Sequence, residues 1–494
     1  MRIKEVLQRQ EQSVKTAIKC GEESLTYKQW NEKAENLCKK IVEQASMDSK
    51  NVAIFLPNSI SYAVAYFAAA FADKVVVPIG VKAKGPEIMS TLQYCEIDLI
   101  LTGTNMLCNL KDVLEEYPYQ ICVLLVDDER PRYLNRECKK IEKTFAIAFD
   151  GTEDDVFLML HTSGTTSNPK RVMLTHHNLL SNIESNVQSL QLTAQDVTLI
   201  TLPMHFGYCN TAQFLTHVYL GATIVILEGI FYPKSFFDAV QRESVTNFTC
   251  VPTALLLLLQ YRFSSRYDVS SLRYICFGGS SIPAGQLEQL IHMFPTVGFV
   301  QTYGQTEASP RITALLPEDC LRKLGSVGKP IPHVCVTILL EDGTQAPPYQ
   351  IGEIVVQGPN VMKGYYKRDD ITGQTIVNGW LHTGDLGYMD SEGYYFLTGR
   401  KKNMIISGGI NIYPEEIEEI LLQHPDIEEA YVFSEADEVL NEVPAAKIKV
   451  SKYGIDINAL RDYCSQRLAS YKIPTKFDIV TELPKTYNGK LKRY

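Results

Sequence analysis

The chain has 494 residues, of which 45% are hydrophobic and 21% are charged, and its formal net charge is −9. This composition excludes a largely disordered chain, the acidic balance gives no basic surface for nucleic acid, and the length predicts more than one domain. The twelve cysteines are spread singly, without a C-x-x-C pair, so we expect reduced thiols and no metal cluster. Because no stretch has the length and apolarity of a membrane span or signal peptide, we expect a cytoplasmic protein.

The first part of the chain alternates between helical patterns and short apolar runs. Apolar residues recur at helical spacing over residues 26–45, behind Thr26 as a candidate N-cap, and residues 60–72 form a second, more apolar helix pattern. Runs that predict strands lie at residues 52–57, 75–79, 99–103 and 121–126. Strands that alternate with helices predict parallel α/β layers. The charged residues 127–143 then predict a surface connection.

The alternation resumes further along the chain, with strand-like runs at residues 197–202, 222–227, 248–251, 274–278 and 297–300. From Val334 onward, shorter strands and tight turns predict a mostly β subdomain. A second break falls at residues 399–403, before a small α+β unit. We therefore predict an α/β fold, with a large N-terminal domain (residues 1–400) of two α/β layered subdomains plus a β subdomain, followed by a small α+β C-terminal domain (residues 401–494).

One loop has the properties of a phosphate-binding site. An apolar run from Leu158 leads into a small-residue loop that ends at Lys170. Backbone N–H groups and hydroxyls in such a loop can surround an anion, and a lysine adds a positive charge. The loop is not a Walker A motif, because Pro169 and Arg171 flank the lysine where that motif needs Gly and Ser or Thr. A polar surface loop is the alternative interpretation.

Four further stretches combine glycine, hydroxyl, acid and base. In residues 301–308 a tyrosine can stack on a base and Glu307 can hold Mg²⁺, although a strand-end turn with a core tyrosine is the alternative. In residues 379–386 we expect Asp385 in a turn after a strand, where it can accept from ribose hydroxyls or form an Asx-turn. Residues 407–418 hold a Gly pair and a helix start that capping alone would explain. Lys490 follows a turn, and a solvated surface lysine is its alternative.

In this order, the five stretches resemble the AMP-forming adenylation superfamily of acyl-CoA synthetases, nonribosomal-peptide adenylation domains and beetle luciferases. The resemblance covers nearly the whole chain, from Thr26 to Lys490. It implies an ATP- and Mg²⁺-dependent ligase that converts a carboxylic acid into an acyl adenylate, releases pyrophosphate and passes the acyl group to a phosphopantetheine thiol. It also implies that the small C-terminal domain is mobile and rotates between the two steps.

The resemblance assigns roles on the nucleotide side. The residues that match the phosphate loop are Thr162, Ser163, Gly164, Thr165, Thr166 and Lys170. The wall beside adenine is matched by Gly278, Gly279 and Ser280, the stacking residue by Tyr303 with Gly304 beside it, and the ribose-binding pair by Asp385 and Arg400. Thr306 matches a phosphate or acyl-adenylate contact, and Glu307 matches the Mg²⁺ carboxylate.

It also assigns roles at the domain boundary. Lys402 matches the hinge, Gly408 and Gly409 match the loop that shapes the thiol channel, and Lys490 matches the catalytic lysine that reaches the substrate carboxylate. The chain departs from the family where Ser167 and Arg171 replace usual glycines. Both changes remove backbone freedom, while Arg171 adds a second cation near the loop. Since the residues with direct chemical roles are present, we expect an active enzyme.

The stretch 202–211 is expected to determine which acid is used. Members that activate α-amino acids usually carry an aspartate near the position of Tyr208, and no acidic residue occurs between Leu202 and Leu227. Because an unpaired ammonium group buried there would be costly, we expect a small carboxylic acid without an α-amino group. His205, Tyr208 and Cys209 are the predicted pocket residues, with simple packing as the alternative.

The thiol acceptor is expected to be CoA or a separate phosphopantetheinyl carrier protein, with CoA favoured by its frequency in the family. Two other functions stay open at this point: a stand-alone adenylation protein that loads a carrier protein, and a catalytically weak nucleotide-binding protein of the same fold. A luciferase-like oxygenase is also open, but no residue singles it out.

Overall fold

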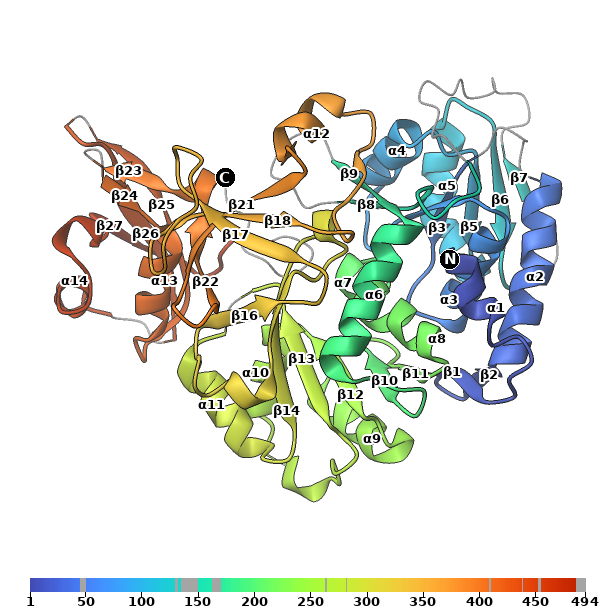
Figure 1. Cartoon of the computed structure of the whole chain (residues 1–494), viewed down its shortest axis with the longest axis horizontal. Coiled ribbons are helices and arrows are strands. Elements are labelled where there is room, and N and C mark those ends of the chain that lie inside the picture. The colour runs from blue at the N-terminus through green and yellow to red at the C-terminus, as the bar shows by residue number, and fades with distance from the viewer. Residues whose placement is uncertain are drawn as a thin grey trace.

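The computed structural model describes residues 1–44, 50–128, 132–134, 150–161, 170–262, 264–280, 282–407, 410–437, 439–451 and 455–485. They form a 14-stranded sheet, an eight-stranded sheet and a five-stranded C-terminal sheet, with helices against them (Figure 1). The predicted α/β fold, with two α/β subdomains, a β subdomain and a small α+β unit, is confirmed.

The eight-stranded sheet is built on parallel strands, with β9 antiparallel beside β8. Alternate residues of β3 enter two different cores: Val52 and Ile54 face one, and Ala53 and Phe55 face the other. This alternation is typical of a strand covered on both faces. The strands are β3 (Asn51–Phe55), β4 (Val75–Pro78), β5 (Leu99–Thr102), β6 (Ile121–Leu125), β7 (Arg132–Leu134), β8 (Val156–His161), β9 (Arg171–Thr175) and β19 (Gly364–Tyr365).

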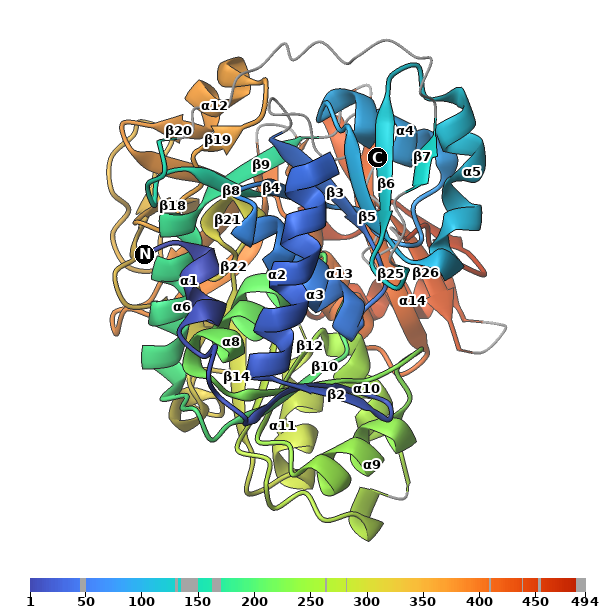
Figure 2. The ribbon, with the colours of Figure 1, turned by 90° about the vertical axis from the view of Figure 1, so that its right-hand side faces the viewer.

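The helices of this half carry the predicted apolar patterns. Thr26 and Gln29 cap the start of α2 (Tyr27–Gln44) reciprocally, since each backbone N–H donates to the other side chain, at 2.9 and 3.2 Å. Helix α3 (Ile60–Phe71) is buried almost all round, and α2 and α3 run side by side (Figure 2). Helices α4 (Gly85–Tyr94) and α5 (Leu107–Glu116) cover the opposite face of the sheet.

The 14-stranded sheet joins the second α/β subdomain to the β subdomain. Its parallel strands are β1 (Thr16–Cys20), β10 (Val197–Ile200), β11 (Thr223–Ile226), β12 (Asn247–Cys250), β13 (Tyr274–Gly278) and β14 (Gly298–Tyr303). Hydrogen bonding then continues antiparallel through β15 (Thr313–Leu315), β16 (Ser326–Pro330), β22 (Tyr395–Arg400), β21 (Trp380–Met389), β18 (Gly352–Gln357) and β17 (Cys335–Leu339). The predicted β subdomain is therefore an extension of the second sheet.

Two layers of side chains enclose this second sheet. Helices α9 (Pro233–Glu243), α10 (Pro252–Leu259) and α11 (Ala284–Met293) cover its outer face. Its inner face shares one core with the first sheet, and α6 (His176–Leu190) lies in that space with buried asparagines. The hairpin of β1 and β2 (Glu23–Thr26), which the sequence did not predict, adds the N-terminal strands to this sheet beside β11.

The C-terminal unit has its own small core. Its elements are β23 (Ile405–Ser407), β24 (Ile410–Ile412), α13 (Pro414–Leu422), β25 (Ile427–Asp437), β26 (Asn441–Val450), α14 (Ile457–Ser465) and β27 (Lys476–Ile479). Helix α13 contacts β22, beside the predicted hinge. The division at residue 400 stays a prediction, and so does the mobility of this unit.

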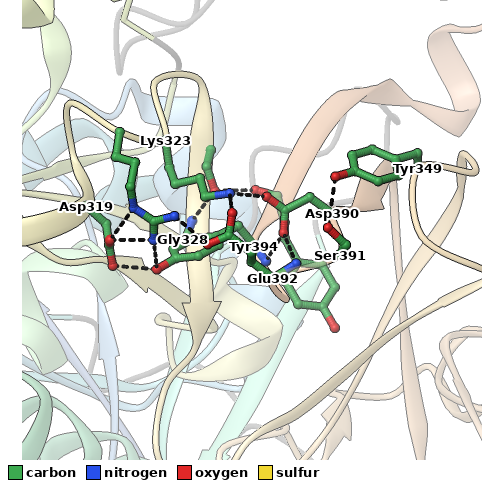
Figure 3. Close-up of polar contacts among 11 residues, drawn as sticks. Asp319, Lys323, Gly328, Tyr349, Asp390, Ser391, Glu392 and Tyr394 are labelled. Atoms are coloured by element: carbon green, nitrogen blue, oxygen red, sulfur yellow. Dashed lines mark hydrogen bonds and ion pairs between the residues drawn. The ribbon is translucent and has the colours of Figure 1, made fainter.

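A group of charged residues, from exposed Glu392 to buried Asp390, fixes the β subdomain to the rest of the large domain (Figure 3). Lys323 lies 2.7 Å from Asp390 and 2.5 Å from Glu392, and Arg322 lies 2.7 Å from Asp319. The Tyr394 hydroxyl donates to Asp319, and the Lys323 ammonium lies 4.8 Å from the Tyr394 ring centroid. We call Asp319, Arg322, Lys323, Asp390, Glu392 and Tyr394 the paired-charge network, because each of its cations has a carboxylate partner.

Candidate active site

Three residues from three strands form a polar cluster where β14 ends. Asp385 and Arg400 are register partners on β21 and β22, with Arg400 Nε 2.8 Å from Asp385 Oδ1. The Tyr303 hydroxyl donates to Asp385 Oδ2 at 2.7 Å. Asp385 lies inside strand β21, so its predicted place in a turn is wrong: the pairing with β22 continues past it and sets Arg400 opposite. The structure therefore brings together the three residues predicted to bind adenosine.

This carboxylate corner fits a ribose. Asp385 is held by Tyr303 and Arg400 through its two oxygens, and carboxylate oxygens are the acceptors that ribose hydroxyls need. The Arg400 side chain is half exposed, which leaves the corner open on one side. Burial raises the pKa of the Tyr303 hydroxyl, and the Asp385 charge raises it further, so this hydroxyl remains a donor to the aspartate.

A second corner forms around Glu307. This residue is 9% exposed and lies in the short helix η4 (Thr306–Ala308), directly after β14. Its Oε1 accepts a hydrogen bond from the Tyr365 hydroxyl at 2.8 Å, and the Lys170 ammonium lies 4.9 Å from the Tyr365 ring centroid. Tyr365 therefore connects the predicted metal ligand to the predicted phosphate-binding lysine. Sequence reasoning missed it, since a tyrosine in a Gly-Tyr-Tyr run has no pattern that indicates these tertiary contacts.

This second corner also fits a metal held together with phosphate. In the part of the chain that the structure describes, no group of three or more His, Cys, Asp or Glu side chains could hold a metal ion. Mg²⁺ commonly uses one or two protein carboxylates and completes its shell with water and substrate phosphates. Glu307 would supply that carboxylate. Burial raises the pKa of the Tyr365 hydroxyl, so this hydroxyl stays protonated and fixes the orientation of Glu307.

Two glycines allow the backbone to bend near these corners. A Cβ at Gly304 would lie 1.7 Å from the carbonyl oxygen of Pro310, so only glycine lets the turn after β14 fold back on itself. Gly279 has φ +89° at the end of β13, a conformation that favours glycine, and both it and Ser280 are exposed. Gly278 lies against Thr302, where a Cβ would be 2.6 Å from Oγ1. Their place beside the nucleotide stays a prediction.

The predicted acid pocket lies beside Thr302, the residue of β14 that precedes Tyr303. The Tyr208 hydroxyl, from α7 (Gly207–Cys209), is 2.8 Å from Thr302 Oγ1. Helix α7 continues as a π-helix, η2 (Asn210–Leu215), and such irregular turns are frequent at functional sites. The His205 Nε2 atom is buried without a hydrogen-bond partner among the described residues, and burial lowers the pKa of His205 to about 4. Cys209 is fully buried in the central core.

Arg171 takes a different place from the one expected. It belongs to β9, is 4% exposed, and its guanidinium hydrogen-bonds the hydroxyl of Thr91 in α4. The positive charge therefore lies inside the protein and is not an exposed second cation at the loop.

Several predicted residues lie outside the described part of the chain: Thr162, Ser163, Gly164, Thr165, Thr166, Ser167, Gly408, Gly409 and Lys490. Their roles stay predictions. Lys402 is described, exposed, in the short helix η6 (Lys401–Asn403). Lys401 pairs across the predicted boundary with Glu353 at 3.1 Å, whereas Asn403 donates to Glu415 within the C-terminal unit, at 3.0 Å.

Within the described ranges, no helix is both long and apolar enough to span a membrane. The cysteines in those ranges are free thiols, and most are buried, although Cys108 and Cys335 are exposed.

Known proteins share both the sequence and the fold. The family described as AMP-binding enzyme matches residues 6–366, and the AMP-binding enzyme C-terminal domain matches residues 416–490. The 2-succinylbenzoate–CoA ligase of Bacillus cereus (strain AH820) is 33% identical over 481 residues, which cover 97% of this chain and 94% of that protein.

Solved structures of CoA synthetases have a similar fold. The o-succinylbenzoate CoA synthetase of Bacillus subtilis in complex with its acyl-adenylate intermediate has a TM-score of 0.87 and 31% identity, covering 100% of this chain and 97% of that one. The same enzyme in complex with ATP and magnesium ion has a TM-score of 0.86 and 31% identity, covering 99% and 98%.

Proposed function

The chain belongs to the AMP-binding enzyme family, and we propose that its acid substrate is 2-succinylbenzoate or a closely similar keto diacid, which it joins to CoA. The prediction of an ATP- and Mg²⁺-dependent acid–thiol ligase that works through an acyl adenylate is confirmed by the full-length similarity to CoA ligases. The same similarity favours CoA over a carrier protein as the acceptor.

The observation that supports this function best is the pair of corners at the end of β14. Tyr303 leads to the carboxylate corner with Asp385, and Glu307, four residues later in the chain, leads to the corner with Tyr365. One corner offers acceptors for ribose hydroxyls, and the other offers a carboxylate for a metal beside a lysine. A single nucleoside triphosphate needs both kinds of group, a short distance apart.

The chemistry brings two anions together, because a carboxylate attacks a phosphate of ATP. Lys170 would place its ammonium beside the phosphate oxygens, and Lys490 would do so near the attacking carboxylate. Mg²⁺, when bound, neutralises charge on the phosphates. Fixed donors and cations of this kind can each contribute about 10²- to 10³-fold in rate, because they need little reorganisation during the reaction. Tyr365 orients Glu307, and Tyr303 with Arg400 orients Asp385.

The acid side agrees with an acid that lacks an amino group. No acidic side chain occurs between Leu202 and Leu227 to pair with an ammonium, as the sequence indicated. The walls contributed by Tyr208 and Thr302 are aromatic and hydroxyl-bearing. These groups suit an aromatic keto acid.

The test is direct. Purified protein is incubated with ATP, Mg²⁺, CoA and 2-succinylbenzoate, and pyrophosphate release and the CoA thioester are measured, with each component omitted in turn. We expect thioester only with all four present, and the Glu307→Gln variant should lose at least about 100-fold in rate. Glu392→Gln, far from the site in the paired-charge network, is the matched control. Thioester formation from malonate, anthranilate or fatty acids, with none from 2-succinylbenzoate, would overturn the proposed substrate but not the ligase activity.

A further inference from the structure

Arg311 is a buried cation next to the predicted acid pocket. It is 2% exposed and ranks among the largest fully buried side chains. One of its terminal guanidinium nitrogens contacts Oδ1 of Asn186 in α6, whereas its Nε has no hydrogen-bond partner among the described residues. Within the same part of the chain, no ion pair joins Arg311 to a carboxylate. The sequence analysis did not single out this residue.

A buried charge with only neutral partners is costly, because an amide oxygen replaces the lost water only in part. The backbone around Arg311 is nevertheless held firmly. The amides of Asn182 and Asn360 both donate to its carbonyl oxygen, at 2.9 and 3.2 Å. These hydrogen bonds hold the backbone at Arg311 in place, although no carboxylate of the described residues pairs with its guanidinium.

The guanidinium faces the inner surface of β13 and the start of α7. Burial raises the pKa of the Cys276 thiol, while the charge of Arg311 and its hydrogen bond with the thiol lower it. Burial raises the pKa of the Tyr208 hydroxyl, and the positive charge of Arg311 acts against this shift. Tyr208 in turn binds Thr302 on β14. Arg311 thus lies close to Tyr208, one of the predicted residues of the acid pocket.

The two carboxylates of the predicted nucleotide site have other partners. Asp385 accepts from Tyr303 and pairs with Arg400, and Glu307 accepts from Tyr365. Neither of them has an interaction with Arg311. Because the described residues supply no counter-ion for this cation, a ligand is the source that the pocket offers.

We propose that Arg311 binds the second carboxylate of the acid substrate, the one that is not activated. This inference rests on the proposed function, since 2-succinylbenzoate carries one carboxylate on its ring and one at the end of its side chain. Joining one of them to CoA leaves the other as an anion inside the pocket. A guanidinium is the side chain best suited to a carboxylate, because its parallel N–H groups match the two oxygens. Asn186 holds the guanidinium in place, and because its amide is neutral, the positive charge stays available for the substrate carboxylate.

The experiment compares the diacid with its two monoacid analogues, 4-oxo-4-phenylbutanoate and 2-butanoylbenzoate, each of which lacks one carboxylate. The analogue that still forms a CoA thioester identifies the activated carboxylate and serves as the reference. For the wild-type enzyme we expect kcat/KM to favour the diacid over this reference. In Arg311→Gln we expect that ratio to fall about 100-fold, mainly through the diacid.

Asn186→Asp provides a second variant that keeps Arg311. The new carboxylate lies beside the guanidinium and occupies it, so the diacid should again lose its advantage. Arg171→Gln is the matched control, because Arg171 is also a buried guanidinium with an unpartnered Nε but contacts Thr91 in α4. In this variant the ratio should stay within about 3-fold of the wild-type value, whatever happens to the absolute rate.

Three results would overturn the inference: a wild-type enzyme that does not prefer the diacid, a ratio that both pocket variants leave unchanged, or an equal loss for both acids in both variants. The last would show that Arg311 only supports the fold. If the wild-type enzyme uses none of the three acids, the proposed substrate is wrong. The ratio of kcat/KM is then measured for malonate relative to propanoate and for phthalate relative to benzoate. If the wild-type enzyme prefers neither diacid to its monoacid, the role of Arg311 is overturned.

Discussion

Charge is treated in opposite ways at two places in this protein. In the paired-charge network, Lys323 lies between Asp390 and Glu392, and Arg322 meets Asp319, so positive and negative charges balance at the junction of two subdomains. At the acid pocket, Arg311 is more deeply buried and meets only neutral groups. A balanced network is complete without a ligand, whereas an unbalanced buried cation is not. The paired-charge network therefore stabilises the fold, whereas the role proposed for Arg311 is recognition of the substrate.

Removing a carboxylate from the balanced region should give the largest effect on stability. Asp390 is 4% exposed and holds Lys323 as well as the backbone N–H groups of Glu392 and Tyr394. We expect Asp390→Ala to lower the free energy of unfolding by about 3 kcal/mol, because it leaves buried donors unpaired. Urea denaturation measures this change, and Glu392→Gln, at an exposed site, should cost much less. If thioester formation fell as steeply as stability, the network would not be separate from the active site.

The corner around Glu307 lies between these two extremes, because there a neutral hydroxyl, that of Tyr365, binds a carboxylate. Tyr365→Phe removes the 2.8 Å hydrogen bond to Glu307. Groups that orient a metal ligand commonly contribute 10- to 100-fold in metal affinity, so we expect the Mg²⁺ concentration for half-maximal pyrophosphate release to rise about 10-fold. Tyr366→Phe, which changes the neighbouring ring, is the control. An unchanged Mg²⁺ dependence would mean that Tyr365 does not position Glu307.

Lowering the pH should reduce the stability that comes from buried neutral histidines but leave the paired-charge network charged. Burial lowers the pKa of His161, His176, His205 and His217 from 6.5 to about 4. The unfolded chain therefore takes up protons first, and stability present above pH 6.5 is lost as the pH falls from 6.5 toward 4, by about 1.4 kcal/mol per pH unit for each histidine. Hydrogen bonds from Lys323 and Arg322 lower the pKa of Glu392, so the network keeps its charge in this window.

Urea midpoints between pH 7 and pH 4 measure this slope. His217→Gln, at a fully buried site, should reduce it by about one histidine's share. A slope that does not change would show that His217 is protonated in the folded protein.

The smallest effect should come from the unbalanced cation itself. Arg311 has no counter-ion among the residues that the structure describes, and Met is an uncharged side chain of similar shape. We therefore expect Arg311→Met to leave the free energy of unfolding within about 1 kcal/mol of the wild-type value or to raise it. Thermal unfolding without ligand checks this. A loss of several kcal/mol would show that Arg311 is balanced within the fold, and the contrast with the network would disappear.

Sequence patterns predicted the strands of both sheets well, because parallel strands covered on both faces are continuous apolar runs, as at residues 121–126 and 274–278. They misplaced Asp385, since Gly384 before it is typical of a turn, while the pairing with Arg400 that keeps it in a strand is invisible along the chain. Tyr365 and Arg311 were missed for the same reason: their partners lie far away in the sequence. Lys170, Glu307 and Asp385 were found because the family motif marks them.

The N-terminal hairpin has a consequence for how the protein is made. Strand β1 pairs in parallel with β11, so that Ile18 lies beside Ile224. During translation the hairpin therefore lacks this neighbour while strands β3 to β10 are synthesised. An unpaired strand edge of this kind attracts other chains. A chain that ends before β11 would leave this edge of β1 open, and we expect it to aggregate through that edge.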